Sequence, residues 1–319
     1  MNETKSGRQL QIAFLFPGQG SQYVGMGKNF CERFLLAREM YGRASEILGW
    51  DVARLSFEGP MEKLTQTCHT QPAVLVHSYI AFRLLEERGV RPAMALGHSL
   101  GEYSALVAAG AADFEAALRL VQARGRFMHE AVPSGGGAMA ALLGAEREVA
   151  EAVCREVDGV VEVANYNGAG QYVLSGEKKA VEAAAALAEV RGTRKVVMLP
   201  VGAPFHCSLL TEAADQMSEV LDGVEFRPLS VPVYANVTGK PVRDAAEAKD
   251  LLRRQIRSSV RWEDAMRSAG EAKPDAVVEV GPGKVLSGLS RRILREVPAW
   301  NVEDGESLEK TVLGLGQLA

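Results

Sequence analysis

The 319-residue chain has few of the features that mark secreted, membrane or disulfide-rich proteins. It contains four cysteines, without a CxxC pair or regular spacing, and only 6% aromatic residues. No apolar run approaches the ~18 residues of a membrane span, and residues 1–11 lack the apolar stretch of a signal peptide. We therefore expect a cytoplasmic protein with free thiols and no membrane partner.

The chain also lacks a large excess of charge of either sign. It has 36 Lys and Arg and 40 Asp and Glu, which gives a net charge of -4. This balance disfavours a nucleic-acid partner. No histidine and cysteine cluster has metal-ligand spacing, and Gly281-Pro282-Gly283-Lys284 lacks the GxxxxGK[ST] pattern of a phosphate loop. The sequence thus predicts neither a metal site nor a nucleotide cofactor.

A core of ordinary size is present, because 47% of the residues are hydrophobic. Apolar runs at 12–16 and 93–96 are each followed by a break and then by helical patterns, such as 73–88 with Pro72 in its first turn. Strands that alternate with helices indicate a parallel sheet covered on both faces. Beyond about residue 298 the patterning is weak, and we expect that tail to be partly ordered.

The middle of the chain has a different rhythm. After the flexible stretch 133–137, strand and helix patterns follow in the order βαββαβ up to residue 199, which is typical of a ferredoxin-like unit. The fold class predicted is α/β. A large α/β-hydrolase-like domain at 1–132 and 204–319 carries the parallel sheet, and a small ferredoxin-like domain at 133–203 is inserted into it.

The strongest chemical signal is the GxSxG segment around Ser99. Gly97-His98-Ser99-Leu100-Gly101 follows a predicted strand and opens a predicted helix, as a nucleophile elbow requires. The turn lifts the serine hydroxyl above the sheet, and the helix N-terminus offers N–H groups to an oxyanion. The alternative is a plain strand–turn–helix connection in which the serine has no role.

A nucleophilic serine needs a base, and His206 is the best-placed candidate. It lies in a loop after the small unit's last strand, and that loop must return to the carboxyl edge of the large sheet. His98 is next to Ser99, where adjacent side chains seldom meet in the required geometry. The histidines of the chain are His69, His77, His98, His129 and His206.

A third signal is a lone charge on an apolar helix face. On the helix that Asp113 can cap, Phe114, Val121, Arg124 and Met128 fall on one stripe. A buried arginine requires an acidic partner or several acceptors. From the pattern alone, Arg124 is either part of a structural salt bridge or a fork that binds a substrate carboxylate.

Together these segments resemble the malonyl-CoA:acyl carrier protein transacylase family. The similarity covers nearly the whole chain, from about residue 12 to residue 295, and the motifs occur in the family's order. The segments that carry it are Phe16-Pro17-Gly18-Gln19-Gly20-Ser21-Gln22, Gly97-His98-Ser99-Leu100-Gly101-Glu102, Gln122-Ala123-Arg124-Gly125, Pro204-Phe205-His206 and Glu279-Val280-Gly281-Pro282-Gly283-Lys284.

The resemblance implies roles for single residues. Ser99 matches the nucleophile, His206 its base and Arg124 the arginine that grips the malonyl carboxylate. Gln19 and Leu100 match the residues whose backbone N–H groups form the oxyanion hole. Further matches are Gln255, whose backbone carbonyl orients the histidine, and His98 and Asn167, which line the cleft.

The activity implied is a two-step transfer from malonyl-CoA, through malonyl-Ser99, to the phosphopantetheine thiol of acyl carrier protein. It implies no cofactor, and we expect a monomer that serves fatty acid synthesis. The carrier alternatively belongs to polyketide synthesis. The resemblance also suggests that Phe205 excludes an α-methyl group, although an ordinary packing role is equally open.

Acyl carrier proteins are typically acidic, so basic surface residues are docking candidates. Two other functions share some of these features. An α/β-hydrolase shares GxSxG but transfers to water, and a non-catalytic CoA-binding or carrier-binding module keeps the fold alone. The docking candidates are Lys284, Arg291, Arg292, Arg295, Arg253 and Arg257.

Overall fold

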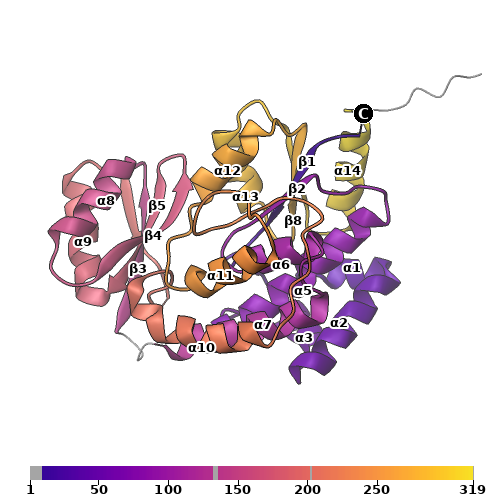
Figure 1. Cartoon of the computed structure of the whole chain (residues 1–319), viewed down its shortest axis with the longest axis horizontal. Helices are drawn as coiled ribbons and strands as arrows, with labels where there is room; N and C mark the ends of the chain where they lie inside the picture. The colour runs from indigo at the N-terminus through magenta and orange to yellow at the C-terminus, as the bar shows by residue number, and fades with distance from the viewer. Residues whose placement is uncertain (1–8, 132–135, 202, 319) are drawn as a thin grey trace, which may run out of the picture.

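The computed structural model describes residues 9–131, 136–201 and 203–318, which form two sheets (Figure 1). The larger sheet has the strand order β7-β2-β1-β8-β9, and all its described pairs are parallel. Its strands are β1 (Ile12–Phe16), β2 (Met94–Gly97), β7 (Val233–Tyr234), β8 (Ala276–Val280) and β9 (Ala299–Val302). The predicted parallel sheet is confirmed.

Helices cover both faces of this sheet. The side chains of β1 show this, because they enter one hydrophobic cluster on one face and another cluster on the opposite face in alternation. Phe14 and Phe16 belong to one core cluster, and Ala13 and Leu15 to another. The helices are α1 (Lys28–Arg33), α2 (Leu35–Leu48), α3 (Val52–Glu58), α4 (Met61–Leu64), α5 (Thr67–Glu86), α6 (Gly101–Ala108), α7 (Phe114–Glu130), α10 (Thr211–Asp222), α11 (Ala245–Gln255), α12 (Trp262–Glu271), α13 (Val285–Ile293) and α14 (Gly305–Gly316), with the 3-10 turn η1 (Ser208–Leu210).

The second sheet is antiparallel, has the order β4-β5-β3-β6 and lies with its two helices at one end of the molecule (Figure 1). It also has a hydrophobic cluster of its own. Its elements confirm the predicted βαββαβ order. They are β3 (Gly137–Leu143), α8 (Arg147–Glu156), β4 (Val161–Gly168), β5 (Gln171–Glu177), α9 (Lys178–Val190) and β6 (Lys195–Met198).

The boundaries between two domains, after residue 132 and after residue 203, stay a prediction. Residue 132, residues 133–135 of the predicted linker and residue 202 lie outside the described residues. Backbone hydrogen bonds join the antiparallel sheet to the rest of the chain, from Tyr166 N to Val260 O at 2.9 Å and from Val260 N to Ala164 O at 2.8 Å. Arg147 of α8 also pairs with Asp264 of α12 at 3.0 Å.

Two details of the sequence interpretation are wrong. Helix α5 begins at Thr67, so Pro72 lies inside it and not in its first turn. Burial of Thr67, Thr70 and Gln71 beside the rest of α5 outweighs the local cost of the proline. The tail beyond residue 298 carries β9 and α14, and α14 starts in a capping box between Asp304 and Ser307.

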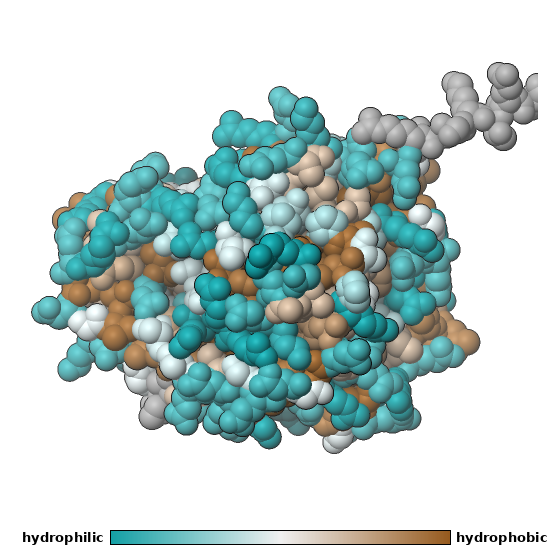
Figure 2. Space-filling view, in the orientation of Figure 1, coloured by the Kyte–Doolittle hydropathy of each residue, from teal (hydrophilic) through white to brown (hydrophobic). Residues whose placement is uncertain are grey.

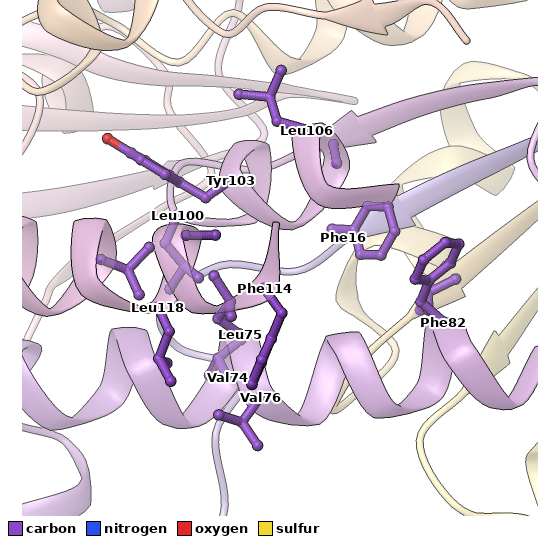
Figure 3. Packing of buried hydrophobic residues seen from close by; sticks show 14 of the residues in the cluster. Phe16, Val74, Leu75, Val76, Phe82, Leu100, Tyr103, Leu106, Phe114 and Leu118 are labelled. Atoms are coloured by element: carbon purple, nitrogen blue, oxygen red, sulfur yellow. The ribbon is translucent and has the colours of Figure 1, made fainter. Parts of the chain in front are cut away.

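The main core lies where α5, α6 and α7 pack on the parallel sheet. Leu75, Leu100 and Phe114 share one buried cluster there (Figure 3). Hydrophilic residues cover most of the face shown in Figure 2, with smaller hydrophobic patches between them. In the described part of the chain, no helix combines the length and apolar character needed to span a bilayer.

Candidate active site

Ser99 stands at the carboxyl end of β2 on a turn that its glycines make possible. Its φ of 53° lies in the left-handed region, a strained conformation for a serine. A Cβ at Gly97 would lie 1.9 Å from the carbonyl carbon of Gly101, and a Cβ at Gly101 would lie 2.1 Å from the carbonyl oxygen of Phe16. Both glycines are therefore required for the turn, and the hydroxyl is lifted off the end of the strand.

His206 reaches Ser99 from the loop that leaves the antiparallel sheet. Its Nε2 lies 2.7 Å from Ser99 Oγ, and its Nδ1 lies 2.9 Å from the backbone oxygen of Gln255 and 3.2 Å from that of Ser258. Because carbonyl oxygens only accept, Nδ1 carries the proton and Nε2 is the free acceptor. The ring thus has the tautomer that a general base needs.

Arg124 is buried beside the same hydroxyl. Gly125 lets α7 approach α5 closely, since a Cβ there would lie 2.8 Å from Thr67 O. The Arg124 Nη2 donates to Ser99 Oγ at 3.0 Å and to the Gln255 side chain at 2.9 Å, and Nη1 donates to Gln71 at 2.8 Å. Its Nε is buried without a partner among the described residues.

No acidic group of the described chain lies within ion-pair distance of Arg124. The alternative of a structural salt bridge is therefore wrong for the part of the protein that is described. The cation is held by neutral acceptors at the nucleophile, and two of its five N–H groups, the one on Nε and one on Nη1, take part in no hydrogen bond among the described residues. Such an arrangement can accept the carboxylate of a ligand.

The two N–H groups predicted for an oxyanion hole are those of Gln19 and Leu100. Within the described ranges neither backbone N–H has a hydrogen-bond partner. Leu100 directly follows the nucleophile as the N-cap of α6, and Gln19 lies in the loop after β1, where its side chain donates to Thr67 at 3.3 Å. Unused N–H groups beside a nucleophile are suited to bind a developing negative charge.

His98 and Asn167 come together across the two sheets. The His98 Nε2 lies 2.8 Å from Asn167 Oδ1, which links the elbow to β4. Both line a cavity of about 440 Å³ between the sheets, together with Ser99 and His206. Other walls are Pro17, Gly18, Gln19, Gly20, Ser21, Gln22, Thr65, Gln71, Met128, Met139, Asn165, Gln171, Val173, Leu199, Pro200, Val201, Phe205, Val285, Leu286 and Leu289.

Arg124, Leu100 and Gln255 do not line this cavity. They are buried, and Arg124 and Gln255 each form a hydrogen bond with Ser99. The sequence reasoning also gave no role to three residues here, Gln71, Glu102 and Asn236. Asn236 Oδ1 accepts from Ser99 N at 2.7 Å, and Glu102 Oε2 accepts from Gln255 Nε2 at 2.6 Å.

Position offered a signal for two of these three residues. Asn236 comes just after a strand of the parallel sheet, at the edge where its sites form. Glu102 lies in the first turn of α6, two positions after Leu100. Gln71 offered no signal, because a glutamine before a proline in an apolar helix is unremarkable.

Burial shifts the titration of the site. It lowers the pKa of His206 to about 3, assisted by the Arg124 charge, so the ring is neutral at ordinary pH. It lowers the pKa of His98 as well. Burial raises the pKa of Glu102 to about 7, against the opposing hydrogen bonds from Gln255 and Asn236.

No group of three or more His, Cys, Asp or Glu in the described ranges is placed to hold a metal ion. Of the basic docking candidates, Lys284 pairs with Glu303, Arg253 with Asp222, and Arg291 bonds the carbonyl of Ala299. The exposed candidates with no such contact in the described part are Arg257, Arg292 and Arg295.

The sequence matches the model of a family described as "Acyl transferase domain" over residues 13–315. It is 42% identical over 305 residues to the malonyl CoA-acyl carrier protein transacylase of Bacillus subtilis, covering 95% of this chain and 96% of that protein. For the enzyme of the same name from Escherichia coli, the identity is 43% over 292 residues, covering 91% and 94%.

Solved structures of similar enzymes also match the fold of this chain. An acyl carrier protein S-malonyltransferase from Vibrio cholerae superposes with a TM-score of 0.90 at 41% identity, covering 94% of this chain and 99% of that one. A malonyl-transacylase in complex with its type II PKS acyl-carrier protein superposes with a TM-score of 0.93 at 40% identity, covering 95% and 99%.

Proposed function

Because the chain belongs to the malonyl CoA-acyl carrier protein transacylase family, we propose that it transfers a malonyl group from CoA to acyl carrier protein through an ester on Ser99. The chain is an acyltransferase, and it supplies malonyl units for fatty acid synthesis. One observation carries the proposal: His206 Nε2 and Arg124 Nη2 lie 2.7 Å and 3.0 Å from the same Ser99 oxygen. A base and a carboxylate-binding cation thus meet at one nucleophile.

In the first half-reaction, neutral His206 takes the Ser99 proton while Oγ attacks the thioester carbonyl. The N–H groups of Gln19 and Leu100 bind the oxyanion. The C–S bond then breaks, and the proton passes from His206 to the leaving CoA thiolate. The malonyl carboxylate is bound by Arg124, which keeps the acyl group in place.

In the second half-reaction, the phosphopantetheine thiol of the carrier gives its proton to His206. The thiolate attacks malonyl-Ser99, and Oγ leaves with the proton. The Gln255 and Ser258 carbonyls orient His206 in the place of the usual carboxylate. Among the described residues, no carboxylate contacts the His206 ring.

Intact-mass spectrometry after mixing with malonyl-CoA tests this function. The malonyl mass is expected on the wild-type chain, at Ser99 after digestion, and absent from Ser99→Ala. Release of free malonate without carrier would indicate a hydrolase, and the absence of any adduct would indicate a binding module. Either of these results contradicts the proposal.

A polyketide carrier is a second candidate acceptor. The observation in its favour is the similarity to a malonyl-transacylase solved with a type II PKS acyl-carrier protein. Incubating the malonyl-enzyme with a carrier of each type separates the two, since the cognate carrier removes the malonyl group faster. Docking through Arg257, Arg292 and Arg295 is proposed for both, because these side chains have no ion pair among the described residues and a carrier is acidic.

The proposal includes a monomer in the cytoplasm that works without a cofactor. The four cysteines are free thiols, which is the state that a reducing compartment favours. Phe205 lines the cavity immediately before His206 in the chain. A bulky ring at that place supports selection of malonyl over a methyl-branched acyl group.

A further inference from the structure

Arg124 is a fully buried cation whose bonds all go to neutral groups. Gln71 and Gln255 accept through their side-chain amides, and Ser99 accepts through its hydroxyl. A buried charge without a compensating opposite charge is strongly destabilising. The countercharge for Arg124 therefore has to be sought beyond its direct contacts.

The countercharge is the Glu102 carboxylate, which the Gln255 side-chain amide connects to Arg124. While Gln255 Oε1 accepts from Arg124 at 2.9 Å, its Nε2 donates to Glu102 Oε2 at 2.6 Å. The amide is oriented by its own polarity, since only its oxygen can face the guanidinium and only its nitrogen can face the carboxylate. Glu102 is 2% exposed, so both charges are shielded from solvent.

The same carboxylate also supports the nucleophile. Glu102 Oε2 accepts from the backbone N–H of Asn236 at 3.1 Å. Asn236 in turn holds the elbow, accepting from Ser99 N at 2.7 Å and donating to Gly97 O at 2.6 Å. Glu102 itself touches neither Ser99 Oγ nor the His206 ring in any described contact.

A direct ion pair would have served stability equally well, but it would have filled the guanidinium fork. A carboxylate already bound to Arg124 would compete with the carboxylate of a substrate. With a neutral amide between them, the two charges attract each other while the Nε donor of Arg124 remains unused. The separation thus serves binding as well as stability.

We propose that Glu102 is a positioning residue that provides the countercharge of Arg124 at the distance of one amide, and that Gln255 is the spacer that keeps the guanidinium open to an acyl carboxylate. The inference rests on the proposed function. The proposal implies that the Glu102 carboxylate lowers the affinity for the malonyl group and that the Gln255 side chain raises it. Substitutions of Glu102 and of Gln255 should therefore change malonyl affinity in opposite directions.

The experiment measures kcat/KM for malonyl-CoA and for acetyl-CoA and takes their ratio, which a purely structural defect would not change. It is run at about pH 8, above the value of about 7 to which burial raises the pKa of Glu102. Glu102→Gln keeps the shape and an acceptor oxygen but removes the charge. We expect the malonyl to acetyl ratio to rise on the order of tenfold, because the carboxylate that opposes the substrate's charge is gone.

Gln255→Met tests the spacer while retaining the backbone carbonyl that orients His206. Without the amide, Arg124 and Glu102 have no group between them, and their attraction draws them together. We expect the ratio to fall on the order of tenfold. If Glu102→Gln does not fold, Gln255→Met alone tests the proposal. A malonyl to acetyl ratio of kcat/KM that is unchanged or increased in this variant overturns it.

Glu279→Gln is the matched control. Glu279 is also a buried carboxylate whose pKa burial raises to about 7, but it accepts from the backbone N–H groups of Leu286 and Ser287 and does not contact the Ser99 network. Its substitution should lower the melting temperature and leave the ratio unchanged. A Glu102→Gln ratio equal to that of the wild type, or below it, overturns the inference.

Failure of the proposed function gives a different result. If the wild-type chain forms no malonyl-Ser99, the transferase proposal itself is wrong. If the wild type forms it and the ratio does not respond to Glu102→Gln or Gln255→Met, only the spacer is wrong.

Discussion

The two sheets of this protein differ in what they bury. The antiparallel sheet encloses alanine, leucine, valine and tyrosine side chains. The part built on the parallel sheet encloses that kind of core and also side chains of histidine, arginine and glutamate. Among the described residues, those that are buried are His77, Glu102, Arg124, His206 and Glu279, all outside residues 137–198.

This difference separates two tasks. Charged and proton-accepting groups act more strongly where water is excluded, but they destabilise the fold that holds them. The larger sheet, with helices on both faces, has the core to tolerate that cost, whereas the smaller sheet contributes Asn165, Asn167, Gln171 and apolar walls to the cavity. Substitutions in the part built on the parallel sheet should therefore impair the chemical step, and substitutions in the antiparallel sheet should impair substrate binding in the cavity.

The largest effect should come from His206→Ala. Without a base at 2.7 Å, Ser99 stays protonated, and transfer should fall about 10⁴-fold to 10⁶-fold. Rates of CoA release from malonyl-CoA measure this, with circular dichroism to verify the fold. A loss below about tenfold would mean that another group serves as the base.

Arg124→Ala should act on one substrate only. Loss of a buried carboxylate contact costs roughly 2–5 kcal/mol, or on the order of 10²-fold to 10³-fold in kcat/KM for malonyl-CoA. Acetyl-CoA has no carboxylate to lose, so its loading should be retained or improved. Equal losses with both thioesters would show that Arg124 supports the nucleophile rather than the substrate.

His77→Phe tests the cost of burying ionisable groups. Burial lowers the pKa of His77 to about 4, whereas an unfolded histidine takes up its proton below about 6.5. The wild type should therefore lose stability as the pH falls through that window. The variant should lose about 2 kcal/mol less between pH 8 and pH 5.

Chemical denaturation at the two pH values measures this difference. His129→Gln, at an exposed position, is the control for the loss of a histidine as such. An identical pH dependence for His77→Phe and the wild type would argue against a neutral buried ring.

The smallest effect should come from the antiparallel side. Asn167→Ala removes the partner of His98 at 2.8 Å and should raise KM about tenfold with little change in kcat. Steady-state kinetics with malonyl-CoA separate the two constants. A fall in kcat comparable to that of His206→Ala would remove the distinction between the sheets.

The sequence predicted the features that depend on local pattern. The alternation of strands and helices predicted the parallel sheet, and the βαββαβ order predicted the second sheet. GxSxG predicted the turn at Ser99, because Gly97 and Gly101 leave no room for a Cβ. The apolar stripe of α7 identified Arg124 as unusual, but it left open whether its partner was a protein carboxylate.

Long-range contacts were beyond the reach of such patterns. Asn236 meets the Ser99 backbone across 137 residues of sequence, and Gln255 meets Glu102 across 153. No periodicity encodes such a meeting, which depends on where β7 and α11 pack. The start of α5 was missed for a similar reason, since tertiary packing overrides the local preference of Pro72.

The distance along the chain between Ser99 and its partners also matters while the protein is being made. The nucleophile leaves the ribosome long before its base, which follows 107 residues later, and before Gln255, 156 residues later. A nascent or truncated chain that ends before residue 255 has a serine whose base has no fixed orientation. Such fragments should not consume thioester, so the reactive hydroxyl is switched on only when synthesis is nearly complete.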